Sequence, residues 1–184
     1  MKLVDIAHSK FVQSSTKNGL FIDGTAGNGH DTQFLAKLAY PNGKVWAFDI
    51  QEAAIKATLK RLESSGLADV VTACKCCHSQ VALHIPKNYH GIIDGAMLNL
   101  GYLPGGNHDI KTTPQTTTPT ISAIYKLLRK HAKITILCYR GHVGGQEEAD
   151  LVQNLCSVKD WRMETDLSDR NKPESPILFT VRKI

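Results

Sequence analysis

Short runs of apolar residues alternate along the chain with segments in which apolar residues recur at helical spacing. The helical spacing is found in residues 3–15, 30–40, 51–64, 121–130 and 146–155. The apolar runs are residues 19–23, 44–49, 70–73, 91–98 and 132–139, followed by strand-like runs at 162–165 and 176–181. Strands that alternate with helices form βαβ units around a mostly parallel sheet. The pattern therefore predicts one α/β domain over residues 1–184, with a Rossmann-like, mostly parallel seven-stranded sheet and helices on both faces.

Composition narrows the class of protein. The 184 residues are 42% hydrophobic, enough for one core, and the net charge of +5 suits either a polyanionic partner or a slightly basic enzyme. No apolar run approaches the ~20 residues that span a bilayer, and residues 1–15 lack the apolar centre of a signal peptide. An odd number of cysteines, five, favours reduced thiols. We therefore expect a cytoplasmic protein with no membrane partner.

The first apolar run ends in an acid and passes into a glycine-rich turn, Asp23-Gly-Thr-Ala-Gly-Asn-Gly-His-Asp-Thr32. In an open α/β sheet, ligands bind at the carboxyl ends of the strands, where glycines let the backbone come close to them. Gly24, Gly27 and Gly29 do not have the G-x-G-x-x-G spacing of dinucleotide-binding turns. Asp23 would also repel a pyrophosphate but attract an ammonium or sulfonium group. The turn therefore favours S-adenosylmethionine (SAM) over NAD.

A second acid, Asp49, ends the next apolar run at about 20 residues beyond the turn. A carboxylate at this place can accept hydrogen bonds from both ribose hydroxyls of a nucleoside. It can also cap the helix that follows, and one side chain can do both. Asp49, Ile50 and Gln51 are therefore predicted to be cofactor-binding residues.

The segment Asn99-Leu-Gly-Tyr-Leu-Pro-Gly-Gly106 follows the fourth apolar run. An Asn oxygen can accept N–H bonds from an amine and so direct its lone pair at a methyl group, while Tyr102 can hold a base by stacking. We expect Pro104 beside Tyr102 on the substrate side. The alternative is a Gly/Pro loop that only closes a turn. The Thr- and Pro-rich residues 112–119 predict either a lid over the substrate or a polar loop that ends in a helix N-cap.

The cluster Cys74-Lys-Cys-Cys-His78 contains residue types that bind zinc. Neighbouring residues at a strand end point in alternating directions and cannot all converge on one ion, and the sequence has no second cluster nearby. We therefore predict no metal site. Cys77 and His78 are expected instead to end the third strand beside the adenine of the cofactor.

Three further residues follow predicted strands near the same edge of the sheet. His142 is a candidate proton acceptor or phosphate contact, with a structural turn histidine as the alternative. Arg140 and Lys111 are candidate contacts to substrate phosphates, with solvated surface charges as the alternative.

Three segments together resemble one family. They are the turn Asp23–Thr32, the segment Asn99–Gly106 and the run Tyr139-Arg-Gly-His-Val-Gly-Gly-Gln-Glu-Glu148. The family is that of small bacterial methyltransferases labelled putative rRNA methylases, and the resemblance extends over nearly the whole chain. Some members methylate the aminomethyl group on the wobble uridine of tRNA, which completes 5-methylaminomethyl-2-thiouridine.

The resemblance implies a class I methyltransferase fold, SAM as donor, RNA and in particular tRNA as substrate, and a homodimer. It assigns Asn99, Gly101 and Tyr102 to the methyl-transfer site, where Asn99 and Gly101 are also expected to contact the cofactor. The family pattern has an acid and a lysine after Gly-Gly, where this chain has Asn107 and His108. From the first motif it assigns these residues to the cofactor: Asp23, Gly24, Ala26, Gly27, Asn28, His30, Asp31 and Thr32.

The mechanism that these assignments predict is direct transfer of a methyl group from a sulfonium to a neutral amine. Most of the catalysis is then positioning and desolvation. Asn99 orients the amine, Tyr102 holds the base, and His142 or water takes the proton. The rival hypotheses are an NAD-linked oxidoreductase, a non-catalytic module that binds RNA or SAM, and a methyltransferase that acts on rRNA or a small amine.

Overall fold

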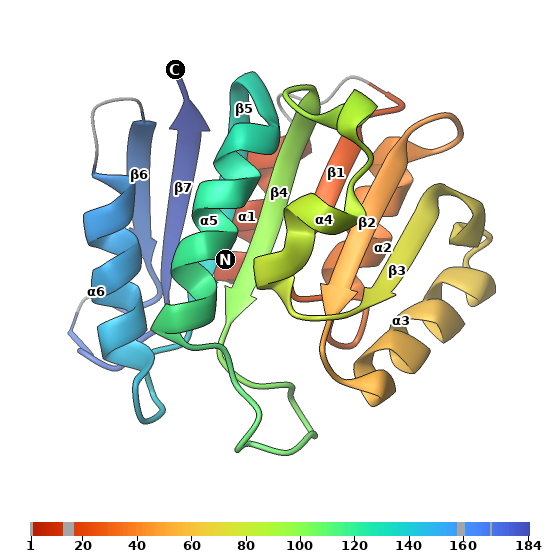
Figure 1. Ribbon diagram of the computed structural model, residues 1–184. Coiled ribbons are helices and arrows are strands. Elements are labelled where there is room, and N and C mark those ends of the chain that lie inside the picture. The colour runs from red at the N-terminus through yellow and green to blue at the C-terminus, as the bar shows by residue number, and fades with distance from the viewer. Residues whose placement is uncertain (1, 13–16, 158–160, 170) are drawn as a thin grey trace.

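Seven strands form a single sheet in the computed structural model, which describes residues 2–12, 17–157, 161–169 and 171–184 (Figure 1). The strands are β1 (Leu20–Asp23), β2 (Lys44–Asp49), β3 (Val71–Lys75), β4 (Ile93–Leu100), β5 (Leu128–Cys138), β6 (Trp161–Leu167) and β7 (Ile177–Lys183). The helices are α1 (Leu3–Val12), α2 (His30–Ala39), α3 (Glu52–Ser64), α4 (Val81–His84), α5 (Pro114–Leu127) and α6 (Gly145–Cys156). Short 3₁₀ turns cover Ala68–Val70, His78–Gln80 and Lys87–Tyr89.

The strand order is β3-β2-β1-β4-β5-β7-β6. Strands β1 to β5 are parallel to one another, whereas β7 inserts antiparallel between β5 and β6. In the register, Phe21 of β1 lies between Val45 of β2 and Gly95 of β4. The predicted Rossmann-like, mostly parallel seven-stranded sheet is confirmed.

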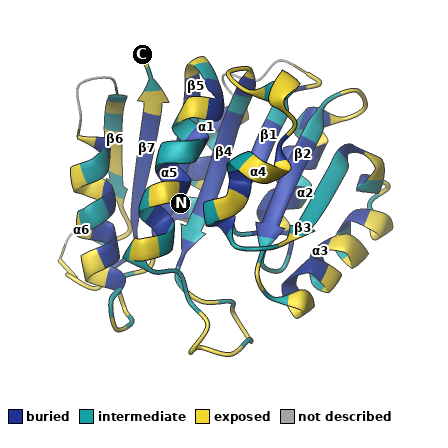
Figure 2. Cartoon of the chain, in the orientation of Figure 1, coloured by how far each residue is buried: buried dark blue, intermediate teal, exposed yellow. Residues whose placement is uncertain are grey.

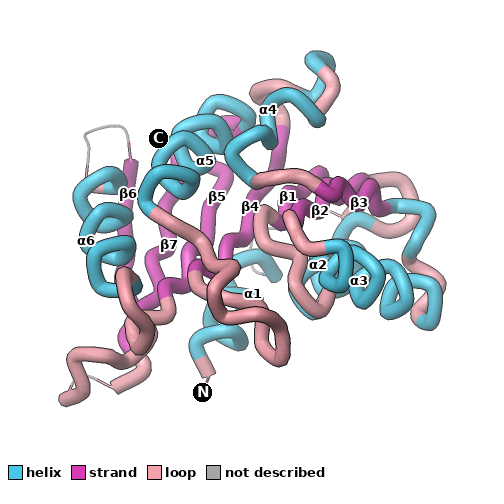
Figure 3. The backbone as a smooth tube through the Cα atoms, turned by 60° about the horizontal axis from the view of Figure 1, so that its bottom comes forward, coloured by secondary structure: helices cyan, strands magenta, loops and turns pink. Residues whose placement is uncertain are grey.

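Helices cover both faces of this sheet, which Figure 3 shows obliquely, with α4 and α5 on one side of it and α1, α2 and α3 on the other. Helices α4, α5 and α6 pack on one face in a core cluster that includes Ile22, Leu98 and Ile136. Helices α1, α2 and α3 pack on the other face in a second cluster that includes Phe21 and Leu137. Because successive residues of a strand point to opposite faces, neighbours such as Phe21 and Ile22 serve different clusters. The central strands are accordingly buried on both sides (Figure 2).

The largest difference from the predicted elements is in α5, which begins at Pro114 and not at residue 121. Pro114 occupies the first turn, where it is tolerated, and the backbone N–H of Thr113 donates to Thr116 Oγ1 at 3.4 Å. Of the two alternatives for residues 112–119, the helix N-cap is therefore present. A lid of irregular structure is not, because most of the segment is helical. β-Branched threonines have weak helix propensity, which hid these turns from the periodicity analysis.

Other boundaries differ by a few residues. Strand β4 begins at Ile93 and not at residue 91, because Gly91 adopts a left-handed φ of +81° in the preceding turn. Helix α5 ends at Leu127, where β5 starts. The last predicted turn of the first helix, residues 13–15, lies outside the described residues. No helix within the described ranges is long and apolar enough to cross a membrane.

Candidate active site

The carboxyl ends of the parallel strands surround a cavity of about 700 Å³. Turns after all five parallel strands line it, with Gly24, Ile50, Cys77, Gly101 and Tyr139 as examples. The chain leaves β1 toward α2 on one face and leaves β4 toward α5 on the other. Such a point, where connections depart in opposite directions, opens a crevice at the sheet edge and is where open α/β proteins bind ligands.

The turn between β1 and α2 brings backbone close to this crevice. Gly27 and Gly29 have positive φ angles of +52° and +78°, which side chains with a Cβ rarely adopt. A Cβ on Gly29 would also lie 2.7 Å from the Cα of Thr58 in α3. The turn therefore needs glycine at position 29 for two reasons, backbone conformation and close packing.

Asp49, at the end of β2, holds this turn from the opposite wall. Its Oδ2 accepts the backbone N–H of Gly27 at 3.0 Å, and its Oδ1 accepts the N–H of Gln51 at 2.9 Å. The N-cap residue of α3 is Gln51, so Asp49 stands two residues before the helix and does not occupy the N-cap position itself. Each carboxylate oxygen keeps lone-pair capacity for a hydroxyl, since an ionised carboxylate has about four acceptor sites.

Asp23 and Thr32 lie beneath the cavity and are not in its lining. Asp23 is fully buried and accepts hydrogen bonds from Thr32 Oγ1 at 2.6 Å and from the backbone N–H of Thr25 at 3.1 Å. Burial, with the nearby negative charge of Asp31, raises the pKa of Asp23 to about 7. The sequence predicted that Asp23 and Thr32 contact the ligand directly, but in the structure they support the glycine turn from below.

Asn99 is fixed by two hydrogen bonds near the end of β4. Its backbone N–H donates to Thr25 Oγ1 at 2.7 Å, and its side-chain Nδ2 donates to Asp31 Oδ2 at 2.5 Å. An ionised carboxylate only accepts, so the amide nitrogen faces Asp31 and the amide oxygen Oδ1 faces away from it. Both residues line the cavity. Asn99 therefore presents an acceptor oxygen of defined orientation.

The loop after β4, which runs between β4 and α5 in Figure 1, is tied to α6 through a buried carboxylate. Gly101 N–H donates to Thr112 Oγ1 at 2.9 Å, and Thr112 Oγ1 in turn donates to Glu148 Oε2 at 2.7 Å. Thr117 donates to the other oxygen of Glu148 at 2.5 Å. Only 2% of Glu148 is exposed. The chain of bonds fixes the base of a loop that is otherwise largely exposed (Figure 2).

Tyr102 and Lys111 lie opposite each other in this loop, joined by an antiparallel bridge. The ring of Tyr102 is 39% exposed and stacks on His108 with 4.0 Å between ring centroids. Lys111 Nζ donates to the carbonyl of Val143 at 2.8 Å, which ties the loop to the turn after β5. Lys111 is therefore more than a solvated charge, although its charge remains at the cavity wall.

The turn after β5 supplies Arg140 and His142. Arg140 Nε donates to the carbonyl of Ser175 at 2.6 Å, so part of its guanidinium holds the approach to β7. His142 Nδ1 lies 3.1 Å from the carbonyl of Val143. A carbonyl only accepts, so Nδ1 carries the hydrogen and Nε2 the lone pair. That Nε2 atom is buried and has no partner among the described residues.

Cys77 and His78 line the cavity at the end of β3, as predicted. Burial lowers the pKa of His78, although a hydrogen bond with the Gly24 backbone acts in the opposite direction. The lowered pKa favours a neutral ring. Its Nε2 is buried and lacks a partner within the described part of the chain. The same described residues contain no group of three or more His, Cys, Asp or Glu placed to hold a metal ion.

The structure thus brings most of the predicted site residues together in one cavity. The predicted residues that line it are Gly24, Ala26, Gly27, Asn28, His30, Asp31, Asp49, Ile50, Gln51, Cys77, His78, Asn99, Gly101, Tyr102, Pro104, Lys111, Arg140 and His142. Sequence reasoning missed Thr25, Thr112 and Tyr139 in the lining and Glu148 behind it. Thr25 lies inside the predicted turn, Thr112 begins the predicted Thr- and Pro-rich segment, and Tyr139 and Glu148 begin and end the third family motif, but none of the four was assigned a place in the site.

Comparison with known proteins places the chain in a family. Residues 45–181 match the family model described as "Putative rRNA methylase". A chloroplastic tRNA (mnm5s2U34)-methyltransferase of Arabidopsis thaliana is 34% identical over 193 residues, which covers 99% of this chain and 69% of the relative. A ribosomal RNA small subunit methyltransferase H of Magnetococcus marinus is 27% identical and covers 84% of this chain, which spans 53% of that relative.

Solved structures of similar proteins match this chain over nearly its whole length. The putative rRNA methylase of Clostridium thermocellum has a TM-score of 0.91 at 34% identity, covering 98% of this chain and 97% of its own. SMU.1697c, a putative methyltransferase of Streptococcus mutans in complex with SAH, has a TM-score of 0.87 at 29% identity, covering 100% and 99%. These matches confirm the resemblance found in the sequence motifs. The chain belongs to the family of putative rRNA methylases.

Proposed function

We propose that the chain transfers the methyl group of SAM to an amino group of RNA, and that the amine is the aminomethyl group of the tRNA wobble uridine. The prediction of a SAM-dependent methyltransferase is confirmed at the level of the family, whose members and structural neighbours are named as methyltransferases. The observation that carries the choice of an amine is Asn99, whose side-chain oxygen is held in one orientation at the cavity wall.

The residues present fit SAM. Asp49 has acceptor capacity for two ribose hydroxyls, as its hydrogen bonds to two backbone N–H groups leave lone pairs unused. Phe48, Ile50 and Cys77 offer apolar walls for adenine, and the buried, unpartnered Nε2 of His78 lies on the same side of the cavity. The positive φ of Gly27 lets the backbone approach the ligand. We propose that these residues bind the cofactor, together with Gly24, Ala26, Asn28 and His30 of the first glycine turn, which also line the cavity.

The reaction depends on positioning. When bound, SAM supplies a methyl group activated by a sulfonium, which is a good leaving group. Asn99 Oδ1 accepts a hydrogen of the substrate amine and so turns the nitrogen lone pair toward the reacting carbon. The exposed ring of Tyr102 offers a face for stacking against the uracil ring, and Pro104, Lys111 and Arg140 flank it on the substrate side. Oriented transfer of this kind needs little acid–base chemistry beyond loss of one proton.

tRNA is supported as the substrate by the name of the Arabidopsis relative and by the net charge of +5, which favours a phosphate-rich partner. Ribosomal RNA is the second candidate, because the Magnetococcus relative is named for it. At the substrate loop, Asn107 and His108 replace the acid and lysine of the family pattern, and His108 stacks on Tyr102.

Three further properties belong to the same proposal. We propose that residues 1–184 form one domain, that the protein is a homodimer, and that it works in the cytoplasm. The first is supported by the single sheet with a core on each face, and the last by five free thiols. Light scattering on the purified protein tests the dimer, which a mass of one 20.2 kDa chain would contradict.

The test uses purified protein, labelled SAM and bulk tRNA from a strain that lacks the gene, followed by mass spectrometry of the nucleosides. The expected product is 5-methylaminomethyl-2-thiouridine, with loss of the aminomethyl precursor. Asn99→Ala removes the acceptor oxygen, and Asn154→Ala, an exposed residue of α6, is the matched control.

The outcomes separate the candidates. Label in tRNA at this nucleoside supports the proposal. Label in ribosomal RNA alone would exclude tRNA and favour the second candidate. SAM binding without any labelled product from tRNA, rRNA or small amines would indicate a non-catalytic module, and tight binding of NAD without SAM would indicate an oxidoreductase.

A further inference from the structure

Helix α1 reaches the cavity through a histidine. His8 Nε2 lies 2.6 Å from Asp31 Oδ1, a contact that joins α1 to the first turn of α2 across 23 residues of sequence. The His8 ring also stacks on Phe34, with 3.8 Å between centroids and parallel planes. Since an ionised carboxylate only accepts, His8 donates its Nε2–H. The histidine is therefore held in one tautomer and one ring orientation.

Asp31 stands between this histidine and Asn99. One carboxylate oxygen accepts from His8 and the other from Asn99 Nδ2 at 2.5 Å. Only 6% of Asp31 is exposed, yet it lines the cavity. A carboxylate thus lies one hydrogen bond away from the residue that orients the amine.

The other titratable groups of the cavity are less suited to take a proton from that amine. Burial and the charge of Asp31 raise the pKa of Tyr139, so its hydroxyl keeps its proton at neutral pH. The lone pair of His142 Nε2 is buried at the backbone of Gly101 and Gly145. His30 Nε2 pairs with the Arg61 guanidinium at 3.1 Å.

His78 and Asp49 are on the cofactor side. His78 is near the ribose-binding carboxylate, whose charge acts on it, and Asp49 already holds Gly27 and Gln51. Among the cavity groups considered, Asp31 alone combines direct contact with Asn99 and a carboxylate that can accept a proton.

We propose that Asp31 is the proton acceptor for the substrate amine and that His8 is a positioning residue that keeps the Asp31 carboxylate oriented. This inference rests on the proposed function. It replaces His142 or water, the two acceptors expected from the sequence, and it moves Asp31 from the predicted cofactor set to the substrate side.

The step balances as follows. A primary ammonium on the substrate gives one proton to an oxygen of Asp31: an N–H bond breaks, an O–H bond forms, and the electron pair stays on nitrogen. That pair then forms the N–C bond as the C–S bond of the donor breaks and its electrons stay on sulfur. After the product leaves, Asp31 releases its proton to water.

The charged and titratable groups that face Asp31 come from three elements. His8 of α1 donates to it, Asp23 of β1 lies below it, and Tyr139 follows β5. Loss of the His8 donor would remove the contact that fixes Asp31 Oδ1, so the carboxylate could turn away from the substrate side of Asn99.

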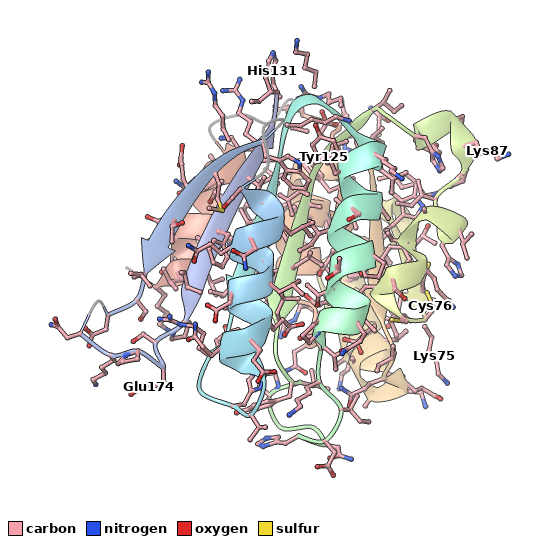
Figure 4. All side chains as sticks on the ribbon, turned by 60° about the vertical axis from the view of Figure 1, so that its left-hand side comes forward. Lys75, Cys76, Lys87, Tyr125, His131 and Glu174 are labelled. Atoms are coloured by element: carbon pink, nitrogen blue, oxygen red, sulfur yellow. The ribbon has the colours of Figure 1, made fainter. Side chains whose placement is uncertain are left out.

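The experiment measures kcat against pH, and SAM affinity by calorimetry, for Asp31→Asn, His8→Leu and His8→Gln. Leu keeps apolar packing on Phe34 but removes the donor, while the amide of Gln can restore an N–H near the position of Nε2. The controls are Asp150→Asn, on the exposed part of α6, and His131→Asn. Glu174 lines the cavity, and His131 lies at the opposite end of the molecule from it (Figure 4). Thermal melts check that each variant folds.

We expect Asp31→Asn to lower kcat by roughly 100-fold or more, the usual scale of general-base catalysis. SAM affinity should stay within about twofold, because the proposal gives Asp31 no cofactor contact. In His8→Leu kcat should fall by roughly 10-fold across the pH range while SAM affinity stays within about twofold, and His8→Gln should restore kcat. The two controls should match the wild type.

A parallel loss of kcat and SAM affinity in Asp31→Asn would make Asp31 a cofactor ligand and overturn the proposal. An unchanged kcat in a folded His8→Leu would do the same, and it decides the matter if Asp31→Asn does not fold. If the wild-type enzyme methylates the amine and the variants remain fully active, the proposed function is supported but the roles given to Asp31 and His8 are wrong. A wild type inert on all RNA would overturn both.

Discussion

Replacing Thr112 by Val breaks the hydrogen-bond chain that ties the loop after β4 to α6, with little change in side-chain shape. Two bonds are lost: the one that Thr112 Oγ1 accepts from Gly101 N–H and the one that it donates to the buried Glu148. A neutral bond contributes about 1 kcal/mol and one to a charged group about 1.5–3 kcal/mol. We therefore expect the free energy of unfolding to fall by about 2–4 kcal/mol, measured by urea denaturation.

The matched control is Thr118→Val in α5. Thr118 is also half-buried, but its hydroxyl bonds only to the carbonyl of Pro114 in the same helix at 3.0 Å, so its loss should cost less than about 1 kcal/mol. Because Tyr102 follows Gly101 directly, Thr112→Val should also lower kcat/KM for RNA by roughly 10- to 100-fold. Equal stability losses in the two variants would refute the idea that Glu148 holds the loop.

Three other variants test separate parts of the site. Asn99→Ala should lower turnover far more than SAM affinity, whereas equal losses of kcat and calorimetric affinity would make Asn99 a cofactor ligand. The folded-state pKa of Asp23, about 7, lies above its ordinary value of 3.8, so folding takes up a proton between these values and stability falls as pH rises through them. Relative to wild type, Asp23→Asn should therefore gain roughly 2–3 kcal/mol between pH 5 and pH 8 in urea titrations, and a difference independent of pH would contradict the raised pKa. Gly29→Ala should destabilise the folded protein by several kcal/mol, whereas Gly66→Ala should cost only about 1 kcal/mol. Both glycines have a positive φ, but only a Cβ at position 29 would lie against Thr58. Equal losses of Tm in the two variants would disprove the packing argument.

The sequence alone predicted the order of strands and helices along the chain, except for the short helix α4, and the edge of the sheet that carries the site. These features depend on local rules: apolar periodicity marks the elements, and glycines with an acid at a strand end mark a turn that approaches a ligand. Asp49, Gly27 and Asn99 could be placed at one edge because parallel strands end together there. The same local rules failed for residues 114–120, because threonine is a weak helix former by itself.

Tertiary structure decided what these residues contact. The Thr-rich start of α5 is helical where Thr117 can donate to a carboxylate on α6, 31 residues away. Asp23 is the acidic residue expected at the end of β1, but its side chain is buried under the glycine turn. His8 lies in a segment with no recognisable motif, yet its ring contacts Asp31. The burial of a side chain, its hydrogen-bond partners and its pKa depend on groups that are distant in the sequence, and no local pattern encodes them. The contacts of the site residues therefore depend on the tertiary structure, in which the sheet brings the ends of its strands together.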